Sequence, residues 1–90
     1  MKSRTTARFR KQLAALPEEV RQQARRAYQQ FKHDPWHRSL RFKQVHSPLI
    51  YSVRLSKGYR AVGKRDQDGK GILWFWIGSH ADYDQLLKQL

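Results

Sequence analysis

The segment from Ile50 to Asp84 constrains the fold most, because it reads as three consecutive strands followed by the start of a helix. Apolar and polar side chains alternate from Tyr51 to Ser56, which is the period of a strand with one packed face and one wet face. The unbroken apolar run ILWFWI, residues 72–77, predicts a central strand that is buried on both faces.

Two tight turns are predicted between these strands, because each connecting segment contains a Gly, which adopts the backbone angles that such turns need. They are Lys57-Gly58 and the segment Asp66–Gly69, and the strand between them runs from Tyr59 to Lys64. The segment therefore predicts an antiparallel meander. Ser79, with Asp82 three residues later, is typical of a helix start, which places His80 in the first turn of a C-terminal helix.

The residues before this segment predict two helices and a further strand. Residues 5–16 place apolar side chains at helical spacing, and a second helix begins at Pro17 and ends near His33, ahead of Asp34-Pro35. Residues 41–45 are expected to form a short strand, and residues 2–4 are a candidate for another short strand ahead of the first helix.

This order of elements predicts an α+β fold. We expect an N-terminal helical hairpin packed on one face of a four-stranded antiparallel sheet, a short C-terminal helix, and an open second face. The 90 residues are expected to form a single domain, 1–90. Since the chain has no Cys and no apolar run long enough for a signal or a membrane span, the expected location is cytoplasmic, away from membranes.

The charge of the chain points to a polyanionic partner. The 19 Lys and Arg exceed the 7 Asp and Glu to give a net charge of +12, and nucleic acid is the partner that such an imbalance favours. Residues 35–65 contain no acid at all. Their basic residues include the candidate RNA and phosphate contacts Arg41, Lys43, Lys57 and Lys64. The alternatives are a charge that only solvates the surface, or an anionic membrane.

Arg54 and Arg60 are candidates for holding a phosphodiester. They lie on adjacent predicted strands across the Lys57-Gly58 turn, so a hairpin brings both guanidinium groups to one patch. Arginine donates two hydrogen bonds to phosphate and stays charged, which serves both binding and transition-state stabilisation. The alternative is that both are exposed cross-strand residues without a ligand.

His80 and Tyr83 complete a candidate catalytic set. The imidazole of His80 can take or give a proton near neutral pH, and the first turn of a helix offers backbone N–H groups to an anion. Tyr83 lies three residues on, at a spacing that shares a helix face. With the arginines, these groups could cleave RNA by its own 2′-hydroxyl, without metal or cofactor. Either residue could instead be structural.

Other aromatic and histidine residues are weaker candidates. Trp74, Phe75 and Trp76 could stack nucleotide bases, but adjacent residues of a strand alternate between faces, which favours a core role. The loop residues His33, His37 and His46 lack the companions that a metal site needs.

Four motifs resemble the RelE/ParE toxin superfamily of bacterial toxin–antitoxin systems. They are LP before the second helix, DPWHRSLRFK, YSVRLSKGYRAVGK and WFWIGSHADYDQLL, and together they cover nearly the whole chain. The resemblance implies a compact α+β toxin that a cognate antitoxin neutralises. For RelE-like members it also implies cleavage of mRNA in the ribosomal A site.

The resemblance also implies roles for individual residues. Arg60 is similar to the strand arginine that stabilises the scissile phosphate, and His80 to a general acid or charge stabiliser. Tyr83 resembles the C-terminal catalytic tyrosine. Arg54 and Lys57 are similar to the basic residues before the arginine, whereas no carboxylate matches the general base of some relatives. We therefore expect an endoribonuclease that acts with ribosome and mRNA; the alternatives are a ParE-like DNA gyrase inhibitor and an inactive, antitoxin-binding member.

Overall fold

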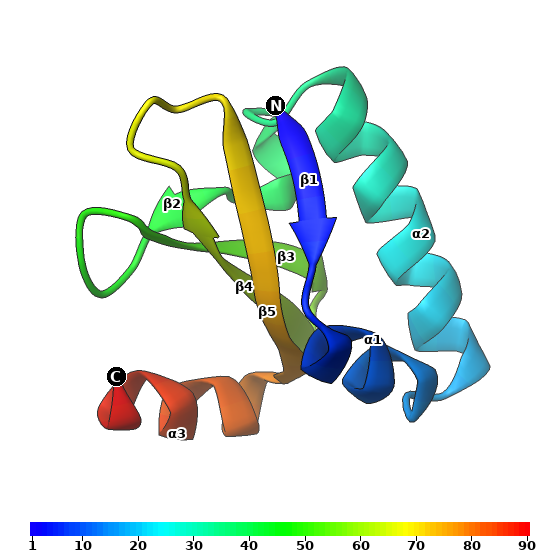
Figure 1. The fold of residues 1–90 in the computed structure, drawn as a ribbon. Helices are drawn as coiled ribbons and strands as arrows, with labels where there is room; N and C mark the ends of the chain where they lie inside the picture. The colour runs from blue at the N-terminus through cyan, green and yellow to red at the C-terminus, as the bar shows by residue number, and fades with distance from the viewer.

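The computed structural model describes all 90 residues, and its five strands form one mixed sheet (Figure 1). The strands are β1 (Lys2–Thr5), β2 (Lys43–Gln44), β3 (Ile50–Ser56), β4 (Tyr59–Arg65) and β5 (Gly71–Ser79), in the spatial order β1-β5-β4-β3-β2. The helices are α1 (Ala7–Ala14), α2 (Glu18–His33) and α3 (His80–Gln89), with a short 3₁₀ turn, η1, at Arg38–Leu40. None of the helices has the length and apolar character needed to cross a bilayer.

The prediction of a four-stranded antiparallel sheet is wrong at one edge. Residues from Lys2 form the additional short strand, β1, that the sequence suggested. This strand pairs parallel to β5, from Lys2 opposite Gly71 to Thr5 opposite Trp74. The indole N–H of Trp74 also donates to Ser3 Oγ at 3.3 Å. The fifth strand covers the outer edge of the most apolar strand, which would otherwise expose unpaired backbone groups.

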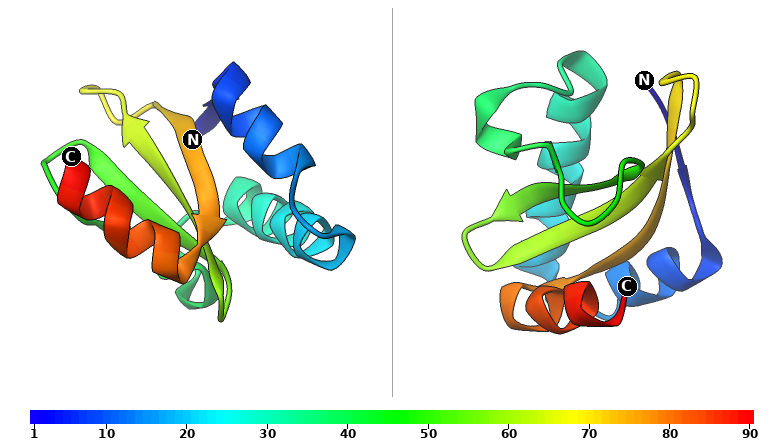
Figure 2. Two further views of the ribbon diagram at one scale, coloured as in Figure 1. Left: turned by 90° about the horizontal axis from the view of Figure 1, so that it is seen from below. Right: turned by 90° about the vertical axis from the view of Figure 1, so that its left-hand side faces the viewer.

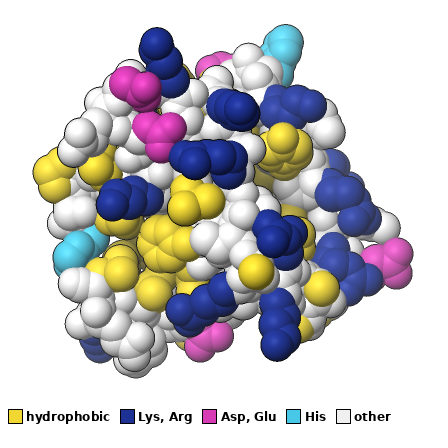
Figure 3. All heavy atoms as spheres, in the orientation of Figure 1, with side chains coloured by type: hydrophobic (Ala, Val, Ile, Leu, Met, Phe, Trp, Pro, Cys, Tyr) yellow, Lys and Arg dark blue, Asp and Glu magenta, His cyan; other side chains and the backbone are white.

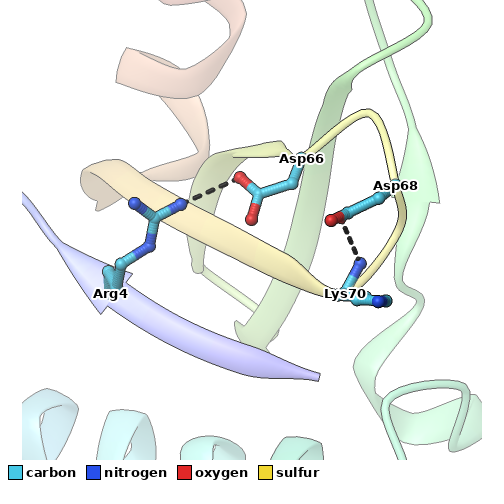
Figure 4. A network of polar contacts seen from close by, with 4 residues as sticks. All are labelled: Arg4, Asp66, Asp68 and Lys70. Carbon is cyan, nitrogen blue, oxygen red and sulfur yellow. Dashed lines mark hydrogen bonds and ion pairs between the residues drawn. The ribbon is translucent and has the colours of Figure 1, made fainter.

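The turn between β4 and β5 ties β1 to the sheet (Figure 4). The guanidinium of Arg4 on β1 donates to Asp66 Oδ1 at 2.8 Å, and within the turn Asp68 Oδ1 accepts from the backbone N–H of Lys70 at 2.9 Å. Gly69 adopts a φ of 74°, a conformation that favours glycine. Because Arg4 and Asp66 are about half exposed, we expect their ion pair to contribute no more than about 1 kcal/mol.

The helices α1 and α2 cover one face of the sheet, whereas α3 lies on the other (Figure 2). α1 packs mainly against β5, and α2 packs against β3. The core beneath the two helices includes Phe31, whose ring makes edge contacts with Phe42 and Trp74 at centroid distances of 5.1 and 5.4 Å. The two helices thus cover one face of the sheet as predicted, but the hairpin differs in detail, because each helix packs on a different strand.

The second face of the sheet is not open, in contrast to the prediction. The C-terminal helix α3 lies across it and inserts Tyr83 against Val62 of β4 and Trp76 of β5. The helix begins as predicted, because Ser79 Oγ accepts a hydrogen bond from the backbone N–H of Asp82 at 3.2 Å. This small second core fixes α3 beside the end of the β3–β4 hairpin.

A β-bulge in β5 sends its two tryptophans to opposite faces. Val62 pairs with Trp76 but the next residue, Gly63, pairs with Trp74, so Phe75 is an extra residue in β5. Simple alternation would have put Trp74 and Trp76 on the same face. Instead Trp74 joins the core under α1 and α2, and Trp76 joins the core under α3, which buries both rings.

Candidate functional site

The β3–β4 hairpin places Arg54 and Arg60 directly opposite each other. Arg54 on β3 is the Cα partner of Arg60 on β4, and Gly78 on β5 is the next residue in the same row. Directly paired residues project to the same face of a sheet, which here is the face that α3 covers in part. The register thus places both candidate arginines in one row of the sheet, while Arg54 also lines a pocket with residues of α2 and η1.

The guanidinium of Arg60 is buried in part and lacks hydrogen-bond acceptors. Its Cζ atom lies 5.4 Å from the ring centroid of Tyr83, while Nε and Nη1 are buried with no partner. Burying charged N–H groups without an acceptor is costly, so such groups are normally paired. The third nitrogen, Nη2, is neither buried nor hydrogen-bonded, so an anion such as phosphate would meet the guanidinium there.

Tyr83 is positioned differently from the catalytic hydroxyl that the resemblance implies. Its side chain is only 6% exposed, and its hydroxyl donates to Oγ of the fully buried Ser52 at 3.4 Å. The ring centroids of Tyr83 and Trp76 lie 6.4 Å apart. In this arrangement Tyr83 contacts the site through its ring, which supports the guanidinium of Arg60.

His80 begins α3 at the edge of the same patch. Its side chain is 48% exposed, and its ring lies 5.8 Å from that of Tyr83. The ring of Tyr83 therefore contacts both Arg60 and His80. The backbone N–H of His80 donates to Gly58 O at 2.8 Å and that of Asp82 to Ser79 Oγ, so these two groups are not free for the anion that the sequence predicts at this helix start.

Asp84 is a further candidate for the site, one that was not predicted from the sequence. Its Oδ2 atom lies 3.6 Å from Nδ1 of His80, one helical turn earlier. A carboxylate beside one imidazole nitrogen orients the ring and leaves the other nitrogen, Nε2, to act on a ligand. The i, i+4 spacing of His80 and Asp84 on a helix was the available signal.

The four other predicted RNA contacts are all exposed, but they do not form a single cluster. Lys43 is paired with Ser52, and Lys64 with Ile50, so both project to the face that carries Arg54 and Arg60. Lys57 lies in the turn between β3 and β4. Arg41 follows η1 with a φ of 46°, which few non-glycine residues adopt. Figure 3 shows Lys and Arg side chains spread across one side of the molecule, with Asp and Glu groups at several places along its margin and apolar side chains between them.

The histidines do not gather into a metal-binding group. No cluster of three His, Cys, Asp or Glu side chains occurs that could hold a metal ion. The candidate site is accordingly a set of arginines, one histidine and one carboxylate.

Several solved structures share this fold at low sequence identity. The isolated RelE toxin of E. coli matches with a TM-score of 0.68 and 19% identity, over 99% of this chain and 98% of that one. The RelE–RelB complex of Pyrococcus horikoshii OT3 matches with a TM-score of 0.68 and 16% identity, over 87% and 92%. YafQ of E. coli matches with a TM-score of 0.70 and 9% identity, over 91% and 96%. No curated protein sequence matches the chain.

A family model that matches most of the chain, together with this shared fold, places the protein in the RelE/ParE toxin superfamily. Residues 18–85 match the model of the ParE-like toxin domain, and the chain belongs to that family.

Proposed function

We propose that this protein is the toxin of a type II toxin–antitoxin pair and cleaves messenger RNA on the ribosome. The observation that carries the proposal is the guanidinium of Arg60, whose buried N–H groups lack acceptors. Arg60 is paired with Arg54 across the hairpin, and the ring of Tyr83 contacts both Arg60 and His80. A phosphodiester bound there would meet the charge of the guanidinium through its open Nη2 atom and would lie beside the exposed imidazole of His80.

The reaction would use the 2′-hydroxyl of the RNA as its nucleophile. As the 2′-oxygen bonds to phosphorus and loses its proton, the bond to the 5′-oxygen of the next nucleotide breaks and that oxygen takes up a proton. The products are a 2′,3′-cyclic phosphate and a 5′-hydroxyl. Arg60 and Arg54 would stabilise the charge that develops on the phosphorus oxygens. His80 would transfer one of the two protons, with Asp84 orienting its ring, and the other proton would be exchanged with solvent water.

A DNA gyrase inhibitor is the second candidate, and two observations favour it. The matching family model describes ParE-like toxins, and the hydroxyl of Tyr83 is bonded to Ser52 inside the protein. A gyrase inhibitor needs a binding surface and no proton transfer, so a buried hydroxyl would cost it nothing. An inactive member that only binds an antitoxin is a third reading.

Two assays distinguish these functions. Purified protein is added to ribosomes programmed with a defined mRNA, and cuts are mapped by primer extension; in parallel, it is added to a gyrase supercoiling reaction. The proposal requires ribosome-dependent cuts that disappear with Arg60→Ala and persist with Arg25→Ala, an exposed arginine on α2. Inhibited supercoiling without cuts would replace the nuclease by the gyrase inhibitor.

The proposed partner is a cognate antitoxin, and the domain 1–90 would act in the cytoplasm, where its ribosome and mRNA targets lie. A net charge of +12 favours an acidic, initially disordered antitoxin segment. This segment would cover the sheet face that carries Arg60 or displace α3 from it. RelE from Methanococcus jannaschii, which has a similar fold, was crystallised in a RelB–RelE antitoxin–toxin complex, which is consistent with such a pair.

A further inference from the structure

A second group of aromatic and cationic side chains lies on the other face of the sheet from Arg60. We call it the aromatic cluster; it consists of Trp36, Phe42, Tyr51 and Arg65. Phe42 belongs to the core under α1 and α2, and Tyr51 packs against that core. The proposed cleavage reaction uses none of these residues.

Trp36 is the most exposed large apolar side chain of the protein, at 58%. Its neighbours nevertheless hold it in place. Its ring lies 4.8 Å from that of Phe42 and 6.5 Å from that of Tyr51, and its backbone N–H donates to Asp34 Oδ1 at 3.0 Å. Packing in the core accounts for Phe42, but it does not account for an indole that is fixed on one side and open to solvent on the other.

Arg65 places a cation beside this open ring. Its Cζ atom lies 5.7 Å from the ring of Trp36 and 5.0 Å from the ring of Tyr51. Its Nη1 atom donates to Tyr51 Oη at 3.3 Å, whereas its Nε atom is buried without a partner. The guanidinium therefore packs against both rings, and its Nη2 atom, which is neither buried nor hydrogen-bonded, is the nitrogen left for a ligand.

We propose that Trp36 stacks an unpaired base of RNA and that Arg65 contacts the same nucleotide. An aromatic face beside an arginine is the arrangement that binds single-stranded nucleic acid, because every base offers a π-face and the cation meets the phosphate. In the chain, the exposed Arg38 and Arg41 lie between Trp36 and Phe42, and residues 35–65 contain no acid between Asp34 and Asp66. This inference rests on the RNA-binding part of the proposed function and adds a contact away from the cleavage site.

The experiment measures binding of a short labelled single-stranded oligoribonucleotide by fluorescence anisotropy. All proteins carry His80→Ala, so that the RNA stays intact. We expect Trp36→Ala to weaken binding roughly 5- to 150-fold, the effect of losing one stacked base, and to leave unchanged the binding of an oligonucleotide of the same length without bases. Tyr28→Ala is the matched control, because Tyr28 is an exposed aromatic residue on α2 outside the cluster.

A second variant keeps the test valid should Trp36→Ala unfold the protein. Trp36→Phe retains a stacking surface and should weaken binding less. Stacking should also quench tryptophan fluorescence when RNA binds to the protein with Trp36 present, and Trp36→Phe should remove that quenching, because Trp74 and Trp76 are buried. Quenching that survives in Trp36→Phe would overturn the proposal.

Vacant ribosomes form the second arm and identify the source of the base. A loss with free oligonucleotides assigns the base to the message, and a loss with ribosomes alone assigns it to ribosomal RNA; either result supports the inference. The stacking inference is overturned if the Trp36→Ala variant binds all RNA as tightly as the parent protein does, or if the substitution weakens only the binding of a protein partner. The proposed function stands in both cases. If the parent protein binds neither free oligonucleotides nor ribosomes, both the stacking inference and the proposed function are overturned.

Discussion

The guanidinium of Arg60 lies over the ring of Tyr83, with its Cζ atom 5.4 Å from the ring centroid, and its Nε and Nη1 atoms face no acceptor. The aromatic ring holds the charge in position, but it cannot replace the hydrogen bonds that the buried N–H groups lack. The arginine is therefore prepared for an anion before one arrives, which is how electrostatic stabilisation of a transition state is achieved.

Arg60→Ala should separate activity from stability. We expect the rate of mRNA cleavage to fall by about 10²–10³, the usual cost of removing one preorganised donor. The free energy of unfolding should change by less than about 1 kcal/mol, because the lost contact with Tyr83 is offset by removal of unpaired buried N–H groups. Ribosome-dependent cleavage and urea unfolding measure the two quantities, with Arg25→Ala as the control. A large loss of stability would mean that Arg60 is a structural residue.

Tyr83→Phe should leave cleavage largely intact, because the ring beneath Arg60 remains. Removing the hydroxyl leaves Ser52 Oγ buried without its partner, and we expect a cost of about 1 kcal/mol in stability. Tyr83→Ala removes the ring and should cost about 3–5 kcal/mol. If Tyr83→Phe abolishes cleavage in a stably folded protein, the hydroxyl is catalytic, as the family resemblance implies, and α3 must move when RNA binds.

Asp84 and His80 should behave as one unit. We expect His80→Ala to lower the cleavage rate by about 10²–10⁴ and Asp84→Asn to lower it by less, because the amide keeps the shape of the carboxylate without its charge. If Asp84 acts only through His80, the double variant should cleave no more slowly than His80→Ala alone. Single-turnover rates of the four proteins complete this cycle, and losses that multiply would show that Asp84 acts independently.

Affinity for RNA should fall steeply as salt rises, because bound cations of the RNA are released by the basic residues. Lys43→Gln and Lys64→Gln should each reduce the slope of log affinity against log salt by about 0.7 per lost contact with a single strand. Lys11→Gln, an exposed residue on α1, is the matched control. Binding that is equally strong at low and physiological salt would contradict the electrostatic basis of the proposal.

Gly63→Ala should destabilise the fold. A Cβ atom at Gly63 would lie 2.8 Å from Cε3 of Trp74 and 2.9 Å from Cγ1 of Ile72, so the core would have to shift at a cost of about 1–3 kcal/mol. Gly58→Ala is the control, since a Cβ atom there meets nothing within 4 Å. Equal unfolding midpoints for the two variants would show that the Trp74 side of the core adapts freely.

The sequence by itself determined the features that depend on neighbouring residues. Alternation from Tyr51 to Ser56 predicted β3, and the Lys57-Gly58 turn predicted where β4 begins. The Ser79 cap predicted the start of α3. The Asp34-Pro35 pair marked the end of α2. These signals act over a few residues, where backbone preferences and the period of a helix or strand are decisive.

The tertiary structure alone decided how distant segments meet. The parallel pairing of β1 with β5 and the bulge at Phe75 depend on which apolar faces the sheet must cover, and so does the burial of the Tyr83 hydroxyl against Ser52. The same holds for Arg65, which meets Trp36 only after the sheet has formed. Residues far apart in the chain pack into the same core, and their contacts depend on how all of them fit together. A local sequence pattern therefore cannot predict these contacts.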